Sequence, residues 1–66
     1  MVDTNRLRGI IAERGTSQRR IANQLGMTDK TFYAKMKSGV FGTDEAEQLV
    51  RLLDIENPAE IFFAGR

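Results

Sequence analysis

Residues 17–39 read SQRRIANQLGMTDKTFYAKMKSG. Apolar residues recur at helical spacing on both sides of Gly26, which is the pattern of amphipathic helices. The stretch therefore predicts two short helices, residues 18–25 and 29–38, joined by a tight turn. Ala22 has a small side chain four residues before the glycine, which lets the second helix approach the first closely. Gly26 adopts a positive φ at little steric cost.

The ends of these two helices carry residues typical of helix termini. Ser17 and Thr28 are predicted N-caps, and Gly39 is predicted to end the second helix. Asp29 lies in the first turn, where a negative charge favours the helix dipole. The side chains predicted to be buried around the turn are Ile21, Ala22, Leu25, Met27, Phe32 and Met36.

The same periodicity predicts a helix before this pair and another after it. The helix before it covers residues 5–14, is capped by Asp3 or Thr4, and ends near Gly15, which suits a left-handed position. The helix after it is expected to be capped by Thr43. The predicted inner faces are Leu7, Ile10 and Ile11 in the earlier helix and Ala46, Leu49, Val50 and Leu53 in the later one.

A last helix is predicted at residues 58–64. Asn57 is its expected cap, Pro58 occupies its first position, and Glu60 is expected to close a capping box. With 41% hydrophobic and 29% charged residues, the chain has the composition of a globular protein. The expected fold class is all-α, in a single compact domain of five helices that spans residues 1–66.

Charge is unevenly distributed along the chain. Residues 14–38 contain six basic residues and one acidic residue, a net charge of +5, whereas the remainder contains four basic and eight acidic residues, a net charge of −4. The two parts sum to the whole-chain charge of +1. A basic segment on two turn-linked helices indicates nucleic acid as the partner.

The composition argues against several other functions. The chain has no cysteine and no histidine, which removes disulfides, thiol chemistry and the usual zinc ligands. No nucleophile and base stand in a recognisable arrangement, so neither an enzyme nor a cofactor or metal is expected. No apolar run approaches the roughly 18 residues of a membrane span. We expect a cytoplasmic protein associated with the nucleoid.

The turn-linked pair resembles the helix-turn-helix of the lambda-repressor-like superfamily, also called the Xre or Cro/repressor type. The similarity rests on the spacing of Ala22 and Gly26 and on the SQ at positions 17–18. It extends to FYAKMKSG at 32–39 and to the closing DEAEQLVRLLDI and PAEIFF segments. Many members have an apolar residue three positions after the one matching Phe32. Here that position is Lys35, and the apolar residue is the next one, Met36.

The resemblance implies a set of DNA-contacting residues, since in this family the second helix of the motif lies in the major groove. The implied base-contacting residues are Thr28, Asp29, Lys30 and Tyr33. The implied phosphate-contacting residues are Gln18, Arg19, Lys37 and Ser38, with Arg14 and Arg20 as weaker candidates. For Asp29 the alternative is a capping or orienting role. For Arg20 the alternative is an ion pair with an acidic residue of the first or fourth helix.

The function implied is that of a sequence-specific regulator of transcription that binds double-stranded DNA, a bacterial or phage repressor. A homodimer on a pseudo-palindromic operator is expected. Its interface candidates are Ile61, Phe62 and Phe63, or alternatively Val40 and Phe41; ordinary core packing is the competing interpretation for the aromatic residues. The alternative function is a protein-interaction module, such as an antitoxin or antirepressor, that retains the fold.

Overall fold

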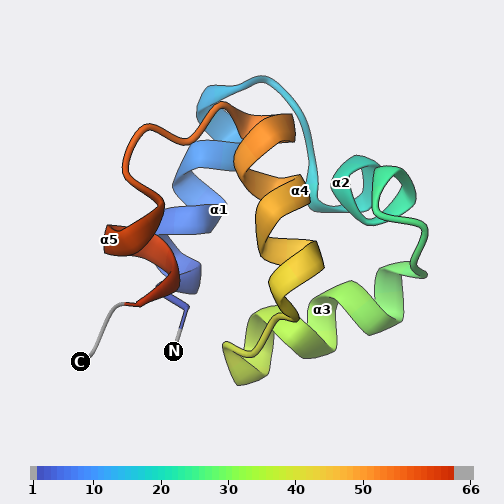
Figure 1. Cartoon of the computed structure of the whole chain (residues 1–66). Helices are drawn as coiled ribbons and strands as arrows, with labels where there is room; N and C mark the ends of the chain where they lie inside the picture. Colours follow the sequence, from blue (N-terminus) through green and yellow to red (C-terminus); the bar gives the residue numbers. More distant parts are fainter. Residues whose placement is uncertain (1, 64–66) are drawn as a thin grey trace.

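The protein is described by a computed structural model, which covers residues 2–63. Within that range the chain forms helices and no strands (Figure 1). The helices are α1 (Thr4–Glu13), α2 (Gln18–Gln24), α3 (Asp29–Ser38), α4 (Thr43–Leu53) and α5 (Pro58–Phe62). The radius of gyration is 10.6 Å, close to the ~11 Å expected of a compact chain of this length. The predicted all-α class is confirmed.

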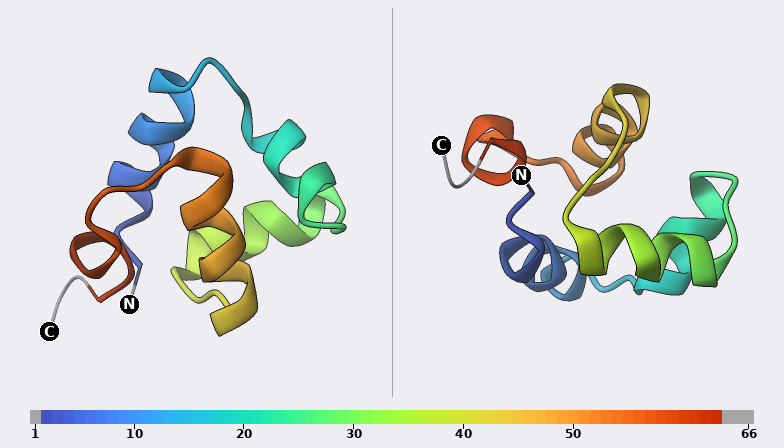
Figure 2. Two further views of the ribbon diagram at one scale, coloured as in Figure 1. Left: turned by 45° about the horizontal axis from the view of Figure 1, so that its top comes forward. Right: turned by 90° about the horizontal axis from the view of Figure 1, so that it is seen from below.

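The helices pack around one shared apolar core. Contacts join α2 to α3 and α1 to α5. In Figure 1 and in the left view of Figure 2, α4 lies between the α1–α5 pair and α2. The helix α3 crosses one end of the molecule, so one of its sides faces the other helices and the opposite side faces outward. No helix of residues 2–63 is long and apolar enough to cross a bilayer.

The turn between α2 and α3 is built as the sequence predicts. The hydroxyl oxygens of Ser17 and Thr28 accept the backbone N–H groups of Arg20 and Thr31, both at 3.2 Å. Gly26 has a φ of 75°, a conformation that costs glycine little. The predicted caps and the left-handed glycine are confirmed: Ser17 marks the start of α2, Gly26 follows its end, and Thr28 marks the start of α3.

Close approach of the two helices depends on Ala22. Its side chain is fully buried, and its carbonyl accepts the N–H of Met27 at 3.0 Å. The Met27 side chain is partly buried against the core. Because this position is fully buried, we expect a larger side chain there to push α2 and α3 apart.

The segment before α1 connects distant parts of the chain. Asp3 rather than Thr4 caps α1, because its Oδ1 accepts the N–H of Arg6 at 3.0 Å. The N–H of Val2 donates to the Gly39 carbonyl at 3.0 Å, and the N–H of Asp3 donates to the Ile61 carbonyl at 2.7 Å. These two bonds tie the end of α3 and the helix α5 to the start of α1.

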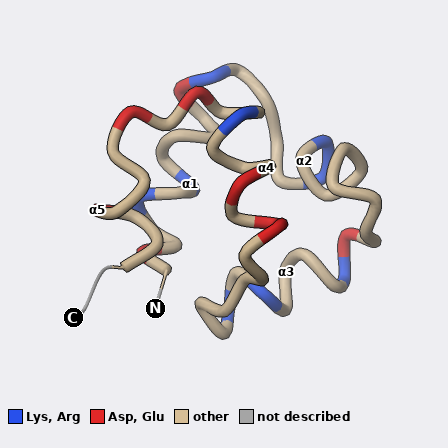
Figure 3. The backbone as a smooth tube through the Cα atoms, viewed as in Figure 1, with Lys and Arg blue, Asp and Glu red and all other residues tan. Residues whose placement is uncertain are grey.

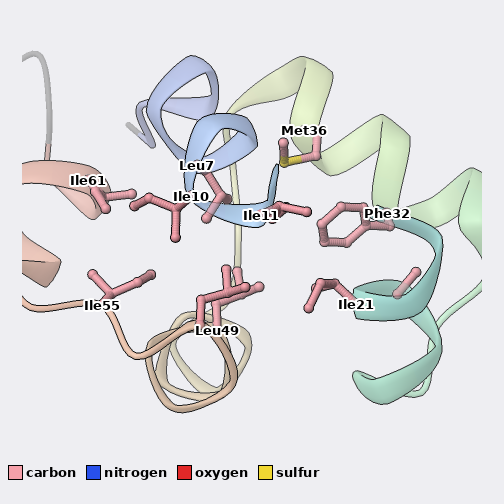
Figure 4. Close-up of a cluster of buried hydrophobic side chains, with 11 residues drawn as sticks. Leu7, Ile10, Ile11, Ile21, Phe32, Met36, Leu49, Ile55 and Ile61 are labelled. Atoms are coloured by element: carbon pink, nitrogen blue, oxygen red, sulfur yellow. The ribbon is translucent and has the colours of Figure 1, made fainter. Parts of the chain in front are cut away.

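The core is one continuous apolar cluster to which every helix contributes. Figure 4 shows it extending from Ile55 and Ile61 at one end to Ile21 and Phe32 at the other. Its buried members are Leu7, Ile10, Ile11, Ile21, Ala22, Phe32, Met36, Leu49, Leu53, Ile55 and Ile61. Leu25, Met27, Phe41, Val50 and Phe62 are partly buried against it.

Two predicted helix starts are wrong in detail. Thr43 is the first residue of α4 rather than its cap; the N-cap is Gly42, whose N–H donates to Glu45 Oε1 at 2.7 Å. Because glycine has no side chain, only this half of a capping box exists.

At α5 the cap position is right but the capping box is wrong. Asn57 is the N-cap and Pro58 the first residue, yet Asn57 makes no side-chain cap hydrogen bond. Its ψ is 76°, whereas ψ is 160° at Ser17 and 158° at Thr28, where the caps do form. The helix ends at Phe62, and the predicted end at Ala64 lies outside the described residues.

We expect Ala22→Leu to lower the free energy of unfolding by about 1–3 kcal/mol, because the larger side chain overpacks the α2–α3 contact. Chemical denaturation followed by helical circular dichroism measures the change. Ala12→Leu, on the exposed side of α1, is the matched control and should stay within about 0.5 kcal/mol of the parent. Equal effects of the two substitutions would show that Ala22 does not limit the packing.

Candidate nucleic-acid interface

The outward side of α3 is set by what its other side buries. Phe32 and Met36, four residues apart, are buried in the core. At 3.6 residues per turn, Lys30, Ala34 and Lys37 share the opposite side, and all three are exposed. The helix therefore presents two ammonium groups separated by a methyl group.

The charges on this side are available to a ligand. The ammonium groups of Lys30 and Lys37 form no hydrogen bond or ion pair in the part of the chain that the structure describes. Figure 3 shows basic positions near both ends of α3 and acidic positions on α4. An anionic ligand that follows α3 thus meets unpaired cations along the length of the helix.

The hydroxyl groups predicted to contact DNA are engaged at the ends of α3. Thr28 accepts from the N–H of Thr31 and donates its own hydroxyl to Thr31 Oγ1 at 3.0 Å. Ser38 donates to the Lys35 carbonyl at 3.2 Å and accepts from the N–H of Val40 at 3.3 Å. Both hydroxyls therefore stabilise the helix termini, and a contact with DNA would need their remaining hydrogen-bonding capacity.

At the start of α3, Asp29 lies beside a cation of α2. Its Oδ2 is 3.4 Å from Arg19 Nε. The pair links the first turns of the two helices and leaves the Arg19 side chain 81% exposed. Asp29 thus has a partner that orients it, and Arg19 keeps most of its surface open to solvent.

At the end of α3, a second ion pair reaches α4. Lys35 Nζ is 3.2 Å from Glu45 Oε1, and the same oxygen accepts the N–H of Gly42. The hydrogen bond from Gly42, helped by Lys35, lowers the pKa of Glu45 against the opposing effect of burial. The side chains of Lys35 and Glu45 are only 31% and 25% exposed. Lys35 thus occupies the position, three residues after Phe32, where the family pattern has an apolar residue, and it pairs with Glu45 instead of packing in the core.

The remaining predicted cations have different surroundings. Arg14 does not face the outer side of α3: its Nε donates to the Leu53 carbonyl at 2.7 Å and its Nη2 to the Asp54 carbonyl at 3.1 Å. It therefore caps the C-terminus of α4. Arg20 is exposed and makes no ion pair with α1, α4 or any other described element, so the pairing considered for it is wrong.

Two further predicted contact residues, Gln18 of α2 and Tyr33 of α3, have unpaired polar side chains. Gln18 is the first residue of α2 and is half-buried. Tyr33 is exposed on α3, next to Phe32 in the chain. Neither side chain has a hydrogen-bond partner within residues 2–63, so both polar groups are open to an external ligand.

The candidate dimer residues separate into buried and exposed members. Ile61 is buried in the core, and Phe62 is half-buried against it. Phe63 is exposed, as is Val40 in the α3–α4 connection. The ring of Phe41 packs against that of Phe32, with centroids 5.8 Å apart. Ordinary core packing therefore accounts for Ile61 and for much of Phe41.

Two features of this surface were missed from sequence. The spacing of Ala34, four residues after Lys30 and three before Lys37, predicts its place on the outer side of α3, but no contact role was predicted for it. The pairing of Lys35 with Glu45 had no signal, because ten residues and a change of helix separate them.

Comparison of the chain with protein-family models, with curated proteins and with solved structures gives no match.

We expect Glu45→Gln to lower the free energy of unfolding at pH 7 by about 0.5–1 kcal/mol, the upper range for a partly exposed ion pair. The pKa of Glu45 is lowered in the folded protein from its ordinary value of 4.5. Its contribution is therefore present above pH 4.5 and lost as the pH falls through the folded-state value. The difference between parent and variant should shrink on acidification.

Urea denaturation between pH 3 and pH 7 measures this difference. Glu47→Gln removes the same charge from an exposed position of α4 that has no ion pair in residues 2–63, and it should show no such trend. A destabilisation by Glu45→Gln that does not depend on pH would contradict the assignment.

Proposed function

We propose that this protein is a sequence-specific transcriptional regulator that binds double-stranded DNA through a helix-turn-helix formed by α2 and α3. It would belong to the lambda-repressor-like type and act as a repressor of bacterial or phage origin. In this proposal α3 enters the major groove and α2 crosses the DNA backbone.

The observation that carries the proposal is the outer side of α3. Two unpaired lysines flank Ala34, and no acidic side chain shares that side. An α-helix fits the major groove, where a lysine donates to guanine O6 and N7. The small side chain of Ala34 allows the helix backbone to lie close to the base edges.

The surroundings of α3 supply contacts of a second kind. In the proposal, Gln18 at the start of α2 and Arg19 beside it contact phosphate oxygens, assisted by backbone N–H groups of the first turn of α2. Lys37 is a further phosphate contact near the end of α3. Such contacts fix the position of the protein on the duplex without reading its sequence.

A second copy of the chain is part of the proposal. One module of this size buries about 600–1,000 Å² of protein surface on DNA, which a dimer doubles. Phe62 and Phe63 are the exposed or half-exposed apolar residues at the end of α5, and Val40 offers a second patch. A two-fold dimer reads two half-sites separated by about one helical turn of DNA.

Selection of bound duplexes from a random pool should yield a pseudo-palindromic consensus with half-site centres about 10 base pairs, or a multiple of this, apart. Sequencing after several rounds of capture measures it. Failure to bind any duplex at low salt and micromolar protein would contradict the proposal. It would favour the alternative of a protein-interaction module with the same fold.

Two lysine substitutions should separate base reading from phosphate binding. Lys30→Met keeps the aliphatic stem and removes the ammonium group. It should cost about 1–3 kcal/mol on the selected site and relax the preference at one position. Lys37→Met should weaken binding to all sequences alike and reduce the slope of log K against log salt by about 1.

Titration of labelled duplexes at several salt concentrations measures both effects. Arg51→Met is the matched control, since it removes one exposed positive charge from α4 rather than from α3. If Arg51→Met weakens binding as much as the other two, net charge and not the outer side of α3 would govern binding.

A further inference from the structure

A shallow groove follows one side of α3 and continues into the connection at residues 39–42. The residues that line it are Lys30, Thr31, Ala34, Lys35, Ser38 and Val40. The inference drawn from it rests on the proposed function, because α3 is the helix placed there in the major groove. The lining of the groove then decides which groups on the bases it recognises.

Most polar groups of this groove are already bonded within the protein. The hydroxyl of Thr31 accepts from Thr28 at 3.0 Å. The ammonium group of Lys35 is held by Glu45, and the hydroxyl of Ser38 donates to the Lys35 carbonyl. Each of these groups therefore already has a partner within the protein, which holds it in place.

The lining residues without a polar partner in residues 2–63 are two apolar side chains and one cation. Ala34 exposes its methyl group, and Val40 is 64% exposed, more than any other large hydrophobic side chain in residues 2–63. Lys30 is the one lining residue whose polar side chain has no partner among residues 2–63. The groove suits a ligand that presents a methyl group close to a hydrogen-bond acceptor.

Duplex DNA presents this combination in its major groove. The C5-methyl of thymine is the apolar group that distinguishes base pairs there, and guanine offers the acceptors O6 and N7. We propose that Ala34 and Val40 form a thymine-methyl subsite, so that the operator half-site contains a thymine within two base pairs of the guanine bound by Lys30. The surrounding positive charge of α3 favours DNA over an apolar peptide as the occupant.

The helix geometry limits how far apart the two bases lie. At 1.5 Å per residue, Lys30 and Ala34 are separated by about 6 Å along the axis of α3. Base pairs follow one another every ~3.4 Å. The thymine therefore lies one or two steps from the guanine, and Val40 extends the apolar contact beyond the end of the helix.

Replacing single thymines of the selected duplex by deoxyuridine tests the subsite, because this change removes only the C5-methyl. At one thymine per half-site, we expect the parent protein to bind about threefold to fivefold more weakly, the effect of burying one methyl-sized group. In Val40→Ala and Ala34→Gly, the ratio of the affinities for the thymine and deoxyuridine duplexes at that position should fall towards one. Fluorescence titration of each protein with each duplex measures the four affinities of the cycle.

Two controls address helix stability and the neighbouring aromatic residue. Ala12→Gly, on an exposed part of α1, carries a helix cost similar to that of Ala34→Gly and should retain the full deoxyuridine effect. Tyr33→Ala should also retain it, since Tyr33 does not line the groove. Circular dichroism confirms that each variant is folded at the temperature of the titration.

The outcomes separate this inference from the proposed function. Binding of the selected duplex with no loss at any deoxyuridine would overturn the subsite and leave DNA binding intact. A loss that persists in both Val40→Ala and Ala34→Gly would assign the methyl contact to another residue and also overturn it. If no duplex is bound at all, the proposed function itself fails.

Discussion

The burial of Phe32 is the constraint on which the rest of the structure depends. It is the largest of the fully buried side chains, and its ring packs against Phe41 just after α3. Together with Met36, it turns one side of α3 into the core. Because the helix is rigid, burying Phe32 and Met36 on one side makes Lys30, on the opposite side, face outward. The core thus determines the chemical character of the exposed surface as well as the stability of the domain.

Tertiary contacts also decide how much of the basic segment is available to a ligand. The +5 charge of residues 14–38 suggests a uniformly cationic surface, yet three of its six cations have partners within the protein. Arg14 binds carbonyls at the end of α4, while Arg19 and Lys35 pair with carboxylates. The ion pairs flank the two ends of α3 and hold it between α2 and α4. The unpaired charge is accordingly concentrated on the outer side of α3 and on Arg20.

The sequence-based predictions were more accurate where the interacting residues lie close together in the chain. Ser17 and Thr28 were recognised as caps because each bonds an N–H three residues away. Thr43 failed as a cap because it is already the first residue of α4 and Gly42 occupies the cap position, and Asn57 failed because its backbone is not extended. Backbone conformation at a cap depends on how the chain enters the helix, which residue type alone does not specify.

By itself, the sequence determined the helices, the turn at Gly26, the buried residues of α2 and α3, and the excess of positive charge around them. These follow from periodicity, small residues and caps, all of which act within a few positions of the chain. Only the tertiary structure decided that Arg14 caps α4, that Lys35 pairs with Glu45, and that Val2 is bonded to Gly39. These partners lie ten to almost forty residues apart, so no local pattern encodes them. They exist because packing of the core brings the helix ends together.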